Sequence, residues 1–281
     1  MQLGIRLHDA KALPLEERLQ VVREQGFVCG HLALGKVIKE YSVKDEALTP
    51  GFAMYLKRLF QKNELDVAVL GCYLNLANPN EAKLKEITER YKANIRFASL
   101  LGCGVVGTET GAPNEAYQHE PACRSEEALE TFIYNLRPVV EYAEKMGVIM
   151  AIEPVWKHIV YDADRAKKVL DAINSPNLQI ILDPVNLLGI ENYKNQVEIV
   201  EHAIEVLGDQ VAVVHIKDYV VKDDELVSVA AGTGQMNYDA LIRFMKERKP
   251  YIHATLENTT PENAVESRKY IQGLWDRCEV K

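Results

Sequence analysis

Short runs rich in apolar and β-branched residues alternate with longer stretches of helical periodicity along the 281-residue chain. This alternation limits the fold more than any other feature, because repeated βα units form a parallel sheet covered by helices. The eight predicted strands are Leu3–Leu7, Val28–Leu34, Asp66–Cys72, Ile95–Leu101, Gly147–Glu153, Leu178–Asp183, Val211–Lys217 and Tyr251–Glu257. The predicted helices read EERLQVVREQG, GFAMYLKRLFQKN, EAKLKEITERYKA, SEEALETFIYNLRPVVEYAEKMG, ADRAKKVLDAI, YKNQVEIVEHAIEVLG, YDALIRFMKER and PENAVESRKYIQGLW.

Eight such units predict a closed (β/α)8 TIM barrel rather than an open doubly wound sheet. An open nucleotide-binding sheet usually has a glycine-rich phosphate loop after its first strand. Here that position reads His8, Asp9, Ala10. No Gly/Ser-rich, Pro-rich or low-complexity segment marks a linker. We therefore expect residues 1–281 to form a single α/β barrel domain, which is an ordinary length for this fold.

The charge balance and the cysteines limit the class of protein. The formal net charge is −8, whereas a broad nucleic-acid-binding face needs clustered lysine and arginine. The five cysteines form no zinc-type spacing, and an odd, scattered set suits reduced thiols. The N-terminus has no secretory pattern, and no apolar run approaches membrane-spanning length. We expect a cytoplasmic protein without a nucleic-acid or membrane partner; whether it forms a homo-oligomer stays open.

The last four predicted strands end in polar residues. Each residue follows an apolar run, and the four are Glu153, Asp183, His215 and Glu257. The carboxyl ends of barrel strands converge on one face, so these side chains are expected to meet. Burying any of them alone would cost several kcal/mol, so something must compensate them. An oxygen-rich set with one imidazole suits Mn²⁺, Mg²⁺ or Co²⁺, and also accommodates Zn²⁺.

The order Glu, Asp, His, Glu on strands five to eight resembles the xylose isomerase-like superfamily of sugar isomerases and epimerases, which includes ketose 3-epimerases. The most specific segments are Ile152-Glu153-Pro154, Leu182-Asp183-Pro184-Val185-Asn186, Val214-His215-Ile216-Lys217-Asp218 and Leu256-Glu257-Asn258. The resemblance spans essentially the whole chain. It implies that the four residues hold one divalent metal ion and that the substrate is a small sugar or sugar phosphate. It further implies that Glu153 and Glu257 act as acid and base, while Asp183 and His215 are ligands only.

Residue chemistry agrees with these implied roles. A substrate carbonyl and its neighbouring hydroxyl can chelate the metal, which polarises the carbonyl and stabilises the enediolate left when a carboxylate removes the α-proton. Returning the proton to the opposite face gives epimerisation. Returning it to the adjacent carbon gives isomerisation. The sequence leaves both outcomes open.

Five further residues are candidates for substrate binding. Asn186 stands where many relatives have a histidine, and the loop with Trp156 and His158 stands where many epimerases have another carboxylate. Trp156 and Tyr73 can stack on a sugar ring. Lys217 lies two residues after His215 and is followed by Asp218. These two residues either orient the histidine or form a plain ion pair with each other.

Other features have weaker implications. His8 and His31 are interpreted as hydrogen-bonded core or rim histidines. Loops 71–75, 107–111 and 232–235 contain glycines that would let the backbone approach a ligand closely.

Three other functions fit parts of this pattern. An inosose-dehydratase-like lyase would use the same metal site with a different general acid. An endonuclease IV-like repair enzyme needs several additional histidines, and both Asn186 and the net charge of −8 argue against it. A barrel that only binds a ligand would need no metal set, so the four residues favour an enzyme.

Overall fold

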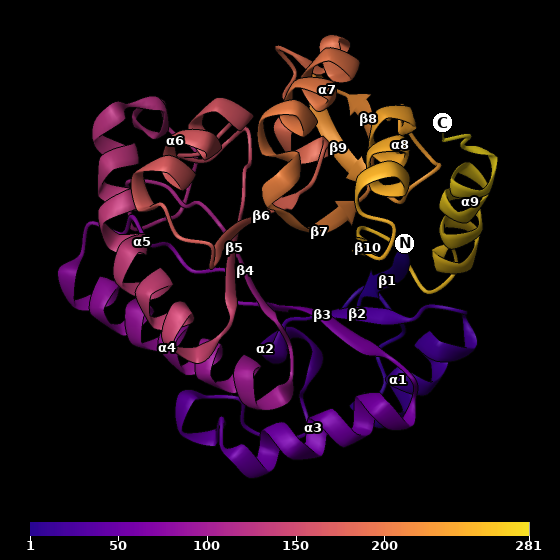
Figure 1. Ribbon diagram of the computed structural model, residues 1–281, viewed down its shortest axis with the longest axis horizontal. Helices are drawn as coiled ribbons and strands as arrows, with labels where there is room; N and C mark the ends of the chain where they lie inside the picture. Colours follow the sequence, from indigo (N-terminus) through magenta and orange to yellow (C-terminus); the bar gives the residue numbers. More distant parts are fainter. Residues whose placement is uncertain (281) are drawn as a thin grey trace.

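Eight parallel strands close into a barrel in the computed structural model, which describes residues 1–280 (Figure 1). Around the barrel their order is β1-β10-β7-β6-β5-β4-β3-β2, and pairing of β1 with β10 completes the ring. The strands are β1 (Gln2–Arg6), β2 (Cys29–Leu32), β3 (Asp66–Gly71), β4 (Val105–Glu109), β5 (Ile149–Glu153), β6 (Leu178–Leu182), β7 (Val211–Ile216) and β10 (His253–Leu256). The predicted TIM barrel is confirmed.

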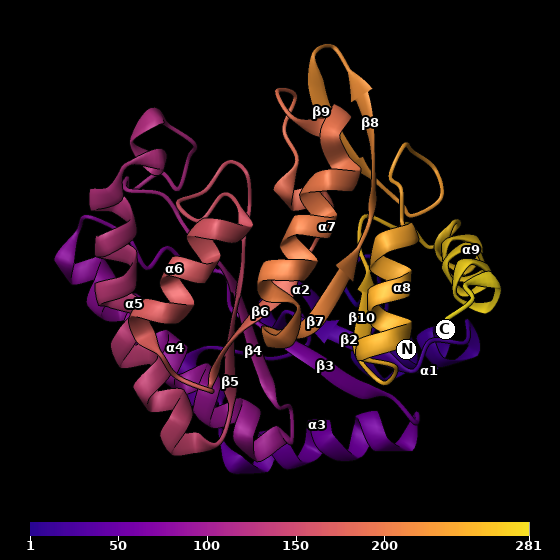
Figure 2. The same cartoon turned by 45° about the horizontal axis from the view of Figure 1, so that its top comes forward.

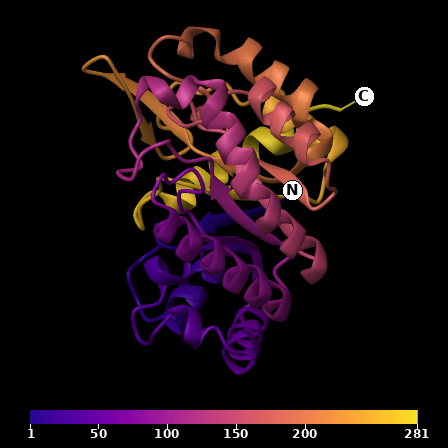
Figure 3. The ribbon, with the colours of Figure 1, turned by 90° about the vertical axis from the view of Figure 1, so that its left-hand side faces the viewer.

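Helices follow the strands and cover the outside of the barrel (Figures 1 and 3). They are α1 (Leu15–Glu24), α2 (Leu34–Val37), α3 (Pro50–Lys62), α4 (Glu81–Leu101), α5 (Glu126–Met146), α6 (Ala163–Ile173), α7 (Gln196–Leu207), α8 (Asp239–Arg248) and α9 (Ala264–Arg277). Short 3₁₀ turns lie at Asp45–Ala47, Pro121–Arg124, Val185–Leu187, Tyr193–Asn195 and Gly208–Gln210. No helix within residues 1–280 has the length and apolarity needed to span a membrane.

The predicted fourth strand, Ile95–Leu101, was wrong. These residues form the last two turns of α4, and the strand is Val105–Glu109 instead. The segment is apolar, but its buried residues recur with helical spacing at Tyr91, Ile95, Ala98 and Leu101. The helix ends where Gly102 adopts a left-handed conformation with φ 83°, the usual role of glycine after a helix.

A β-hairpin that the sequence analysis missed follows the seventh barrel strand. Strands β8 (Asp218–Lys222) and β9 (Glu225–Val229) pair antiparallel and extend beyond the end of the barrel (Figure 2). Asp223 and Asp224 form the turn with φ values of 51° and 58°, which is the type I′ geometry that matches strand twist. The Asp-Asp pair between two β-branched runs was the signal for it.

Asp218 fixes the segment that returns from this hairpin. Its buried carboxylate accepts hydrogen bonds from the backbone N–H groups of Tyr219 (2.8 Å), Met236 (2.8 Å) and Gly232 (3.1 Å). A Cβ at Gly234 would lie only 2.2 Å from the Tyr219 carbonyl oxygen, so this close approach requires glycine.

We predict that Asp218→Ala lowers the free energy of unfolding by about 2–4 kcal/mol, because buried N–H groups lose their acceptor at about 1–3 kcal/mol each. Urea denaturation measures this change. Asp218→Asn is the matched control, since it keeps one acceptor oxygen and should lose less. An Asp218→Ala protein within about 0.5 kcal/mol of the wild type, the range of neutral surface changes, would contradict this account of the loop.

Candidate active site and metal centre

Strand periodicity places three of the four predicted ligands inside the barrel. Ala151, Ile181 and Val213 pack with Val69 in a small cluster within it. Side chains two residues apart on a strand share a face. Glu153, Asp183 and His215 therefore point the same way, one layer nearer the carboxyl ends of β5, β6 and β7.

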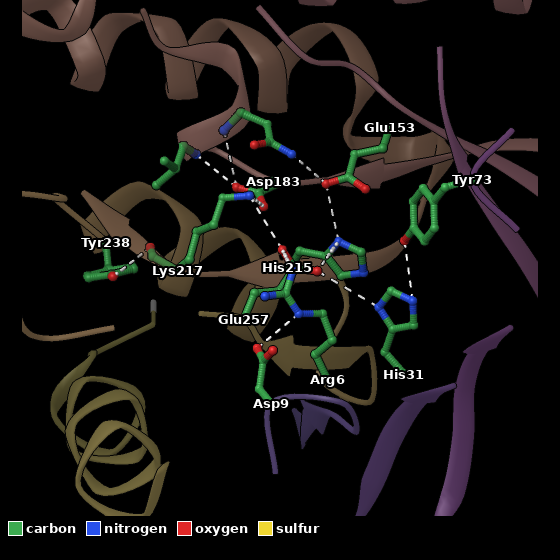
Figure 4. A network of polar contacts seen from close by, with 12 residues as sticks. Arg6, Asp9, His31, Tyr73, Glu153, Asp183, His215, Lys217, Tyr238 and Glu257 are labelled. Carbon is green, nitrogen blue, oxygen red and sulfur yellow. Dashed lines mark hydrogen bonds and ion pairs between the residues drawn. The ribbon is translucent and has the colours of Figure 1, made fainter. Parts of the chain in front are cut away.

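The other three predicted ligands, Glu153, Asp183 and Glu257, lie around His215 (Figure 4). Its Nδ1 lies 3.2 Å from Glu153 Oε1 and 3.3 Å from Glu257 Oε1. The groups form two overlapping triads that share His215, one with Glu153 and Asp183 and the other with His31 and Glu257, and within each triad the candidate ligand atoms lie within 4.8 Å of one another. All five side chains are buried.

The donor set fits a divalent cation. Adjacent ligands bound at about 2.0–2.2 Å lie roughly 3 Å apart, close to the separations between His215 Nδ1 and the two glutamates. Asp183 Oδ2 and His31 Nδ1 are buried without a hydrogen-bond partner among residues 1–280. Buried polar atoms of this kind are costly unless something binds them. Metal binding by Glu153, Asp183, His215 and Glu257 stays a prediction that this geometry supports.

Lys217 brings a positive charge into the same site. Its Nζ lies 2.7 Å from Asp183 Oδ2, in an ion pair without hydrogen-bond alignment, and 3.4 Å from Glu257 Oε2. Lys217 does not pair with Asp218, whose carboxylate instead accepts from the backbone N–H groups of the hairpin segment. Tyr238 holds the Lys217 backbone by donating its hydroxyl to the Lys217 carbonyl at 2.8 Å. The Lys217 ammonium partly balances the negative charge of Asp183, Glu257 and Glu153.

The electrostatics of the centre separate the carboxylates. Burial tends to raise the pKa of Glu257, but His215, Lys217 and Arg6 outweigh it and lower this pKa strongly. Burial raises the pKa of Asp183 to about 6 against the opposing effect of Lys217. Burial tends to lower the pKa of His215, yet Glu153 and Glu257 raise it to about 9. Glu257 is thus held ionised by its cationic neighbours.

Of the predicted substrate-binding residues, Asn186, Lys217 and Tyr73 lie at this centre. The Asn186 side chain donates to Glu153 Oε1 at 2.7 Å. The Tyr73 hydroxyl oxygen lies 3.4 Å from His31 Nε2. Lys217 and Tyr73 help line a cavity of about 170 Å³ above the carboxylates. The cavity is lined by Arg6, His8, His31, Lys36, Tyr73, Glu109, Glu153, Lys217 and Glu257.

Trp156 and His158 lie outside this cavity. Trp156 lines a neighbouring hollow with Gly189 and donates its indole N–H to Glu191 at 3.1 Å. His158 stacks on Tyr117, and its Nδ1 is 3.8 Å from Glu109 Oε2. The structure does not bring Trp156 to the four ligands, and its role in binding stays a prediction.

Three residues at the centre were not assigned to it from sequence. Arg6 Nη1 lies 3.3 Å from Glu257 Oε2, and the ring of His31 stacks on His215 with 5.2 Å between centroids. Strand register places Arg6 beside His31, and Glu109 beside Glu153. Burial, and then Glu153, raise the pKa of Glu109 to about 7. Arg6 and Glu109 end barrel strands and His31 is the penultimate residue of β2, which was the available signal.

A side chain at Gly71 would strike His31. Its Cβ would lie 2.5 Å from His31 Nε2 and 2.8 Å from Tyr73, so glycine makes room for the histidine beside the centre. The pairing of β2 with β3 also shifts register between Gly30 and His31. Such irregularities re-aim side chains next to active sites.

Comparison with known proteins agrees with this fold. The sequence profile described as xylose isomerase-like TIM barrel matches residues 20–274. The chain belongs to this family. Among curated relatives, 3-oxo-isoapionate decarboxylase from Pectobacterium atrosepticum is 28% identical over 152 residues, which are 50% of this chain and 51% of that protein. The match thus spans about half the length of that relative.

Solved structures of the xylose isomerase-like fold extend over the whole chain. A D-tagatose 3-epimerase-like protein gives a TM-score of 0.76 at 22% identity, covering 98% of this chain and 97% of its own. The IOLI protein with a bound zinc atom gives a TM-score of 0.74 at 19% identity, covering 100% of both chains. At these identities the matches show a shared fold.

Proposed function

We propose that this xylose isomerase-like protein is a metal-dependent isomerase or epimerase of a small sugar or sugar phosphate, moving a proton at the carbon next to a carbonyl. The observation that carries the proposal is the pair Glu153 and Glu257, whose Oε1 atoms each lie within 3.3 Å of His215 Nδ1 on the floor of one cavity. Such chemistry needs a base and an acid within reach of one carbon.

The site residues divide the work. A divalent cation held by Glu153, Asp183, His215 and Glu257 would polarise the substrate carbonyl and stabilise the negative charge that develops on proton removal; Mn²⁺, Mg²⁺, Co²⁺ and Zn²⁺ all suit this donor set. The Asn186 amide fixes Glu153 through its hydrogen bond of 2.7 Å. Lys217 and Arg6 hold Glu257 as a carboxylate. One of the two glutamates would remove the proton and the other would return it.

The cavity limits the substrate. A volume of about 170 Å³ suits a short sugar, and its walls offer hydrogen-bonding groups from Tyr73 and Glu109. Tyr117 donates to Glu109 at 3.3 Å and so orients that carboxyl group. These side chains are the proposed partners of the sugar hydroxyls.

A deuterium-exchange experiment tests the proposed function. The Mn²⁺-loaded enzyme is incubated in D₂O with a panel of ketoses, their phosphates and keto sugar acids, and NMR follows deuterium at the carbon next to the carbonyl. We expect incorporation with at least one sugar, and its loss in a Glu153→Gln variant. A panel without any incorporation would reject the isomerase and epimerase assignment.

A lyase is the second candidate. The partial match to 3-oxo-isoapionate decarboxylase favours carbon dioxide loss from a 3-oxo acid, and a dehydratase would use the same carbanion to expel a β-hydroxyl group. Mass spectrometry separates these outcomes, because isomers keep the substrate mass whereas carbon dioxide or water loss lowers it.

A further inference from the structure

Three basic side chains meet at one side of the active-site cavity. Arg6 ends β1, His8 follows two residues later, and Lys36 lies on the short helix α2 that follows β2. All three line the cavity, and the net charge of the whole chain is −8. Basic side chains gathered on one side of a cavity in an acidic protein need a reason.

Arg6 has one edge of its guanidinium group unused by the protein. Its Nε donates to Asp9 Oδ2 at 2.9 Å, and its Nη1 lies 3.3 Å from Glu257 Oε2. Within residues 1–280 no acceptor is found for Nη2. Asp9 and Glu257 thus hold the guanidinium in one orientation. A fixed guanidinium with a donor left over is well suited to bind a carboxylate.

Lys36 and His8 add two more donors. The Lys36 side chain is exposed at the cavity mouth, and its ammonium forms no ion pair with any described residue. It lies near enough to His8 to help lower the pKa of that imidazole, to about 4, after the larger effect of burial and that of Arg6. His8 Nδ1 is buried without a hydrogen-bond partner in the described part of the chain. These donors have no acceptor from the protein.

The opposite wall of the cavity has the reverse character. Glu109 ends β4 and is paired in register with Glu153. Lys217, the other cation lining the cavity, is already engaged by Asp183 and Glu257. An anionic group entering the cavity is therefore attracted to the β1 and β2 side and repelled from the β4 side. This polarity would fix the direction in which an anionic substrate binds.

We propose that the substrate of this site is a sugar acid, a short polyhydroxy carbonyl compound whose terminal carboxylate binds Arg6 Nη2, Lys36 Nζ and His8. The inference rests on the proposed function, because it takes the carbonyl end of the same molecule to lie over Glu153 and Glu257. A carboxylate is favoured over a phosphate because a phosphate site typically adds backbone N–H groups or further basic side chains, whereas the cavity is small and its β1 side offers the side chains of Arg6, His8 and Lys36.

Binding of unreactive analogues tests this assignment without any turnover. Isothermal titration calorimetry on the Mn²⁺-loaded enzyme compares erythronate, erythritol and erythritol 4-phosphate, which share a four-carbon backbone and differ at one end. We expect erythronate to bind most tightly. Lys36→Gln should weaken erythronate roughly tenfold, as expected for one charge-assisted hydrogen bond, and leave erythritol unchanged. Lys36→Arg should retain most of the affinity.

Lys11→Gln is the matched control, because Lys11 is exposed in the loop between β1 and α1, three residues after His8, but does not line the cavity. An equal loss in this variant would indicate general electrostatics and overturn the proposal, as would unchanged erythronate binding in Lys36→Gln. Lys36-dependent preference for the phosphate ester would overturn the carboxylate assignment. Failure of deuterium exchange with all ketoses and all keto sugar acids, alongside Lys36-dependent erythronate binding, would reject the proposed reaction and leave this subsite standing.

Discussion

We expect Glu257→Gln to lower kcat by about 10³-fold or more while the barrel stays folded. Glu257→Gln keeps the size of the side chain but removes the negative charge that it presents to His215, and with it one proton acceptor. Loss of a general acid or base alone typically costs about 10²–10⁴-fold, and a weaker metal ligand adds to this. The cations around it keep other partners, because Lys217 still faces Asp183 and Arg6 still pairs with Asp9.

Steady-state kinetics with the substrate found by deuterium exchange measures the loss, and circular dichroism with a thermal melt checks the fold. Glu130→Gln is the matched control, since Glu130 is exposed on α5 and far from the strand ends in sequence. Its kcat should equal that of the wild type. A Glu257→Gln enzyme with unchanged kcat would remove Glu257 from the mechanism.

The four predicted ligands could be found from the sequence because their signal is local. Each follows an apolar strand and closes it with a charged or imidazole group, and strand periodicity then aims the side chain into the barrel. Asp183 and His215 illustrate this, because each lies two residues beyond an inward-facing Ile181 or Val213. The number of barrel strands was predicted correctly for the same reason, although the fourth strand was placed in α4 instead of at Val105–Glu109.

The rest of the centre depends on three-dimensional contacts that no local pattern encodes. Arg6 is an ordinary charged residue at a strand end until register brings it beside His31 and its guanidinium meets Glu257. His31 was interpreted as a core or rim histidine, and only the β2–β3 irregularity and the stacking on His215 place it at the centre. The orientation of Lys217 toward Asp183 instead of Asp218 likewise follows from how β7 passes into the hairpin.

We expect the stability of the Lys217→Met variant to depend on a bound metal ion. In Lys217→Met the carboxylates of Asp183 and Glu257 lose an ammonium that lies 2.7 Å and 3.4 Å away. Both carboxylates and the lysine are buried. Breaking one partner out of a buried ion pair typically costs about 3–5 kcal/mol, and we expect a loss of this size in the free energy of unfolding of the metal-free protein.

A bound divalent cation would replace the missing positive charge, so saturating Mn²⁺ should restore most of the stability of Lys217→Met. Binding to the folded state alone stabilises by RT ln(1 + [L]/Kd), about 2.7 kcal/mol at a hundredfold excess over Kd. Urea unfolding of wild type and variant in EDTA and in Mn²⁺ gives the four values required.

Lys62→Met is the matched control, because its pair with Glu16 is exposed and an exposed ion pair contributes little to stability. Equal losses with and without Mn²⁺ would mean that no cation binds beside Lys217, and an unchanged stability in EDTA would mean that the ammonium does not compensate these carboxylates.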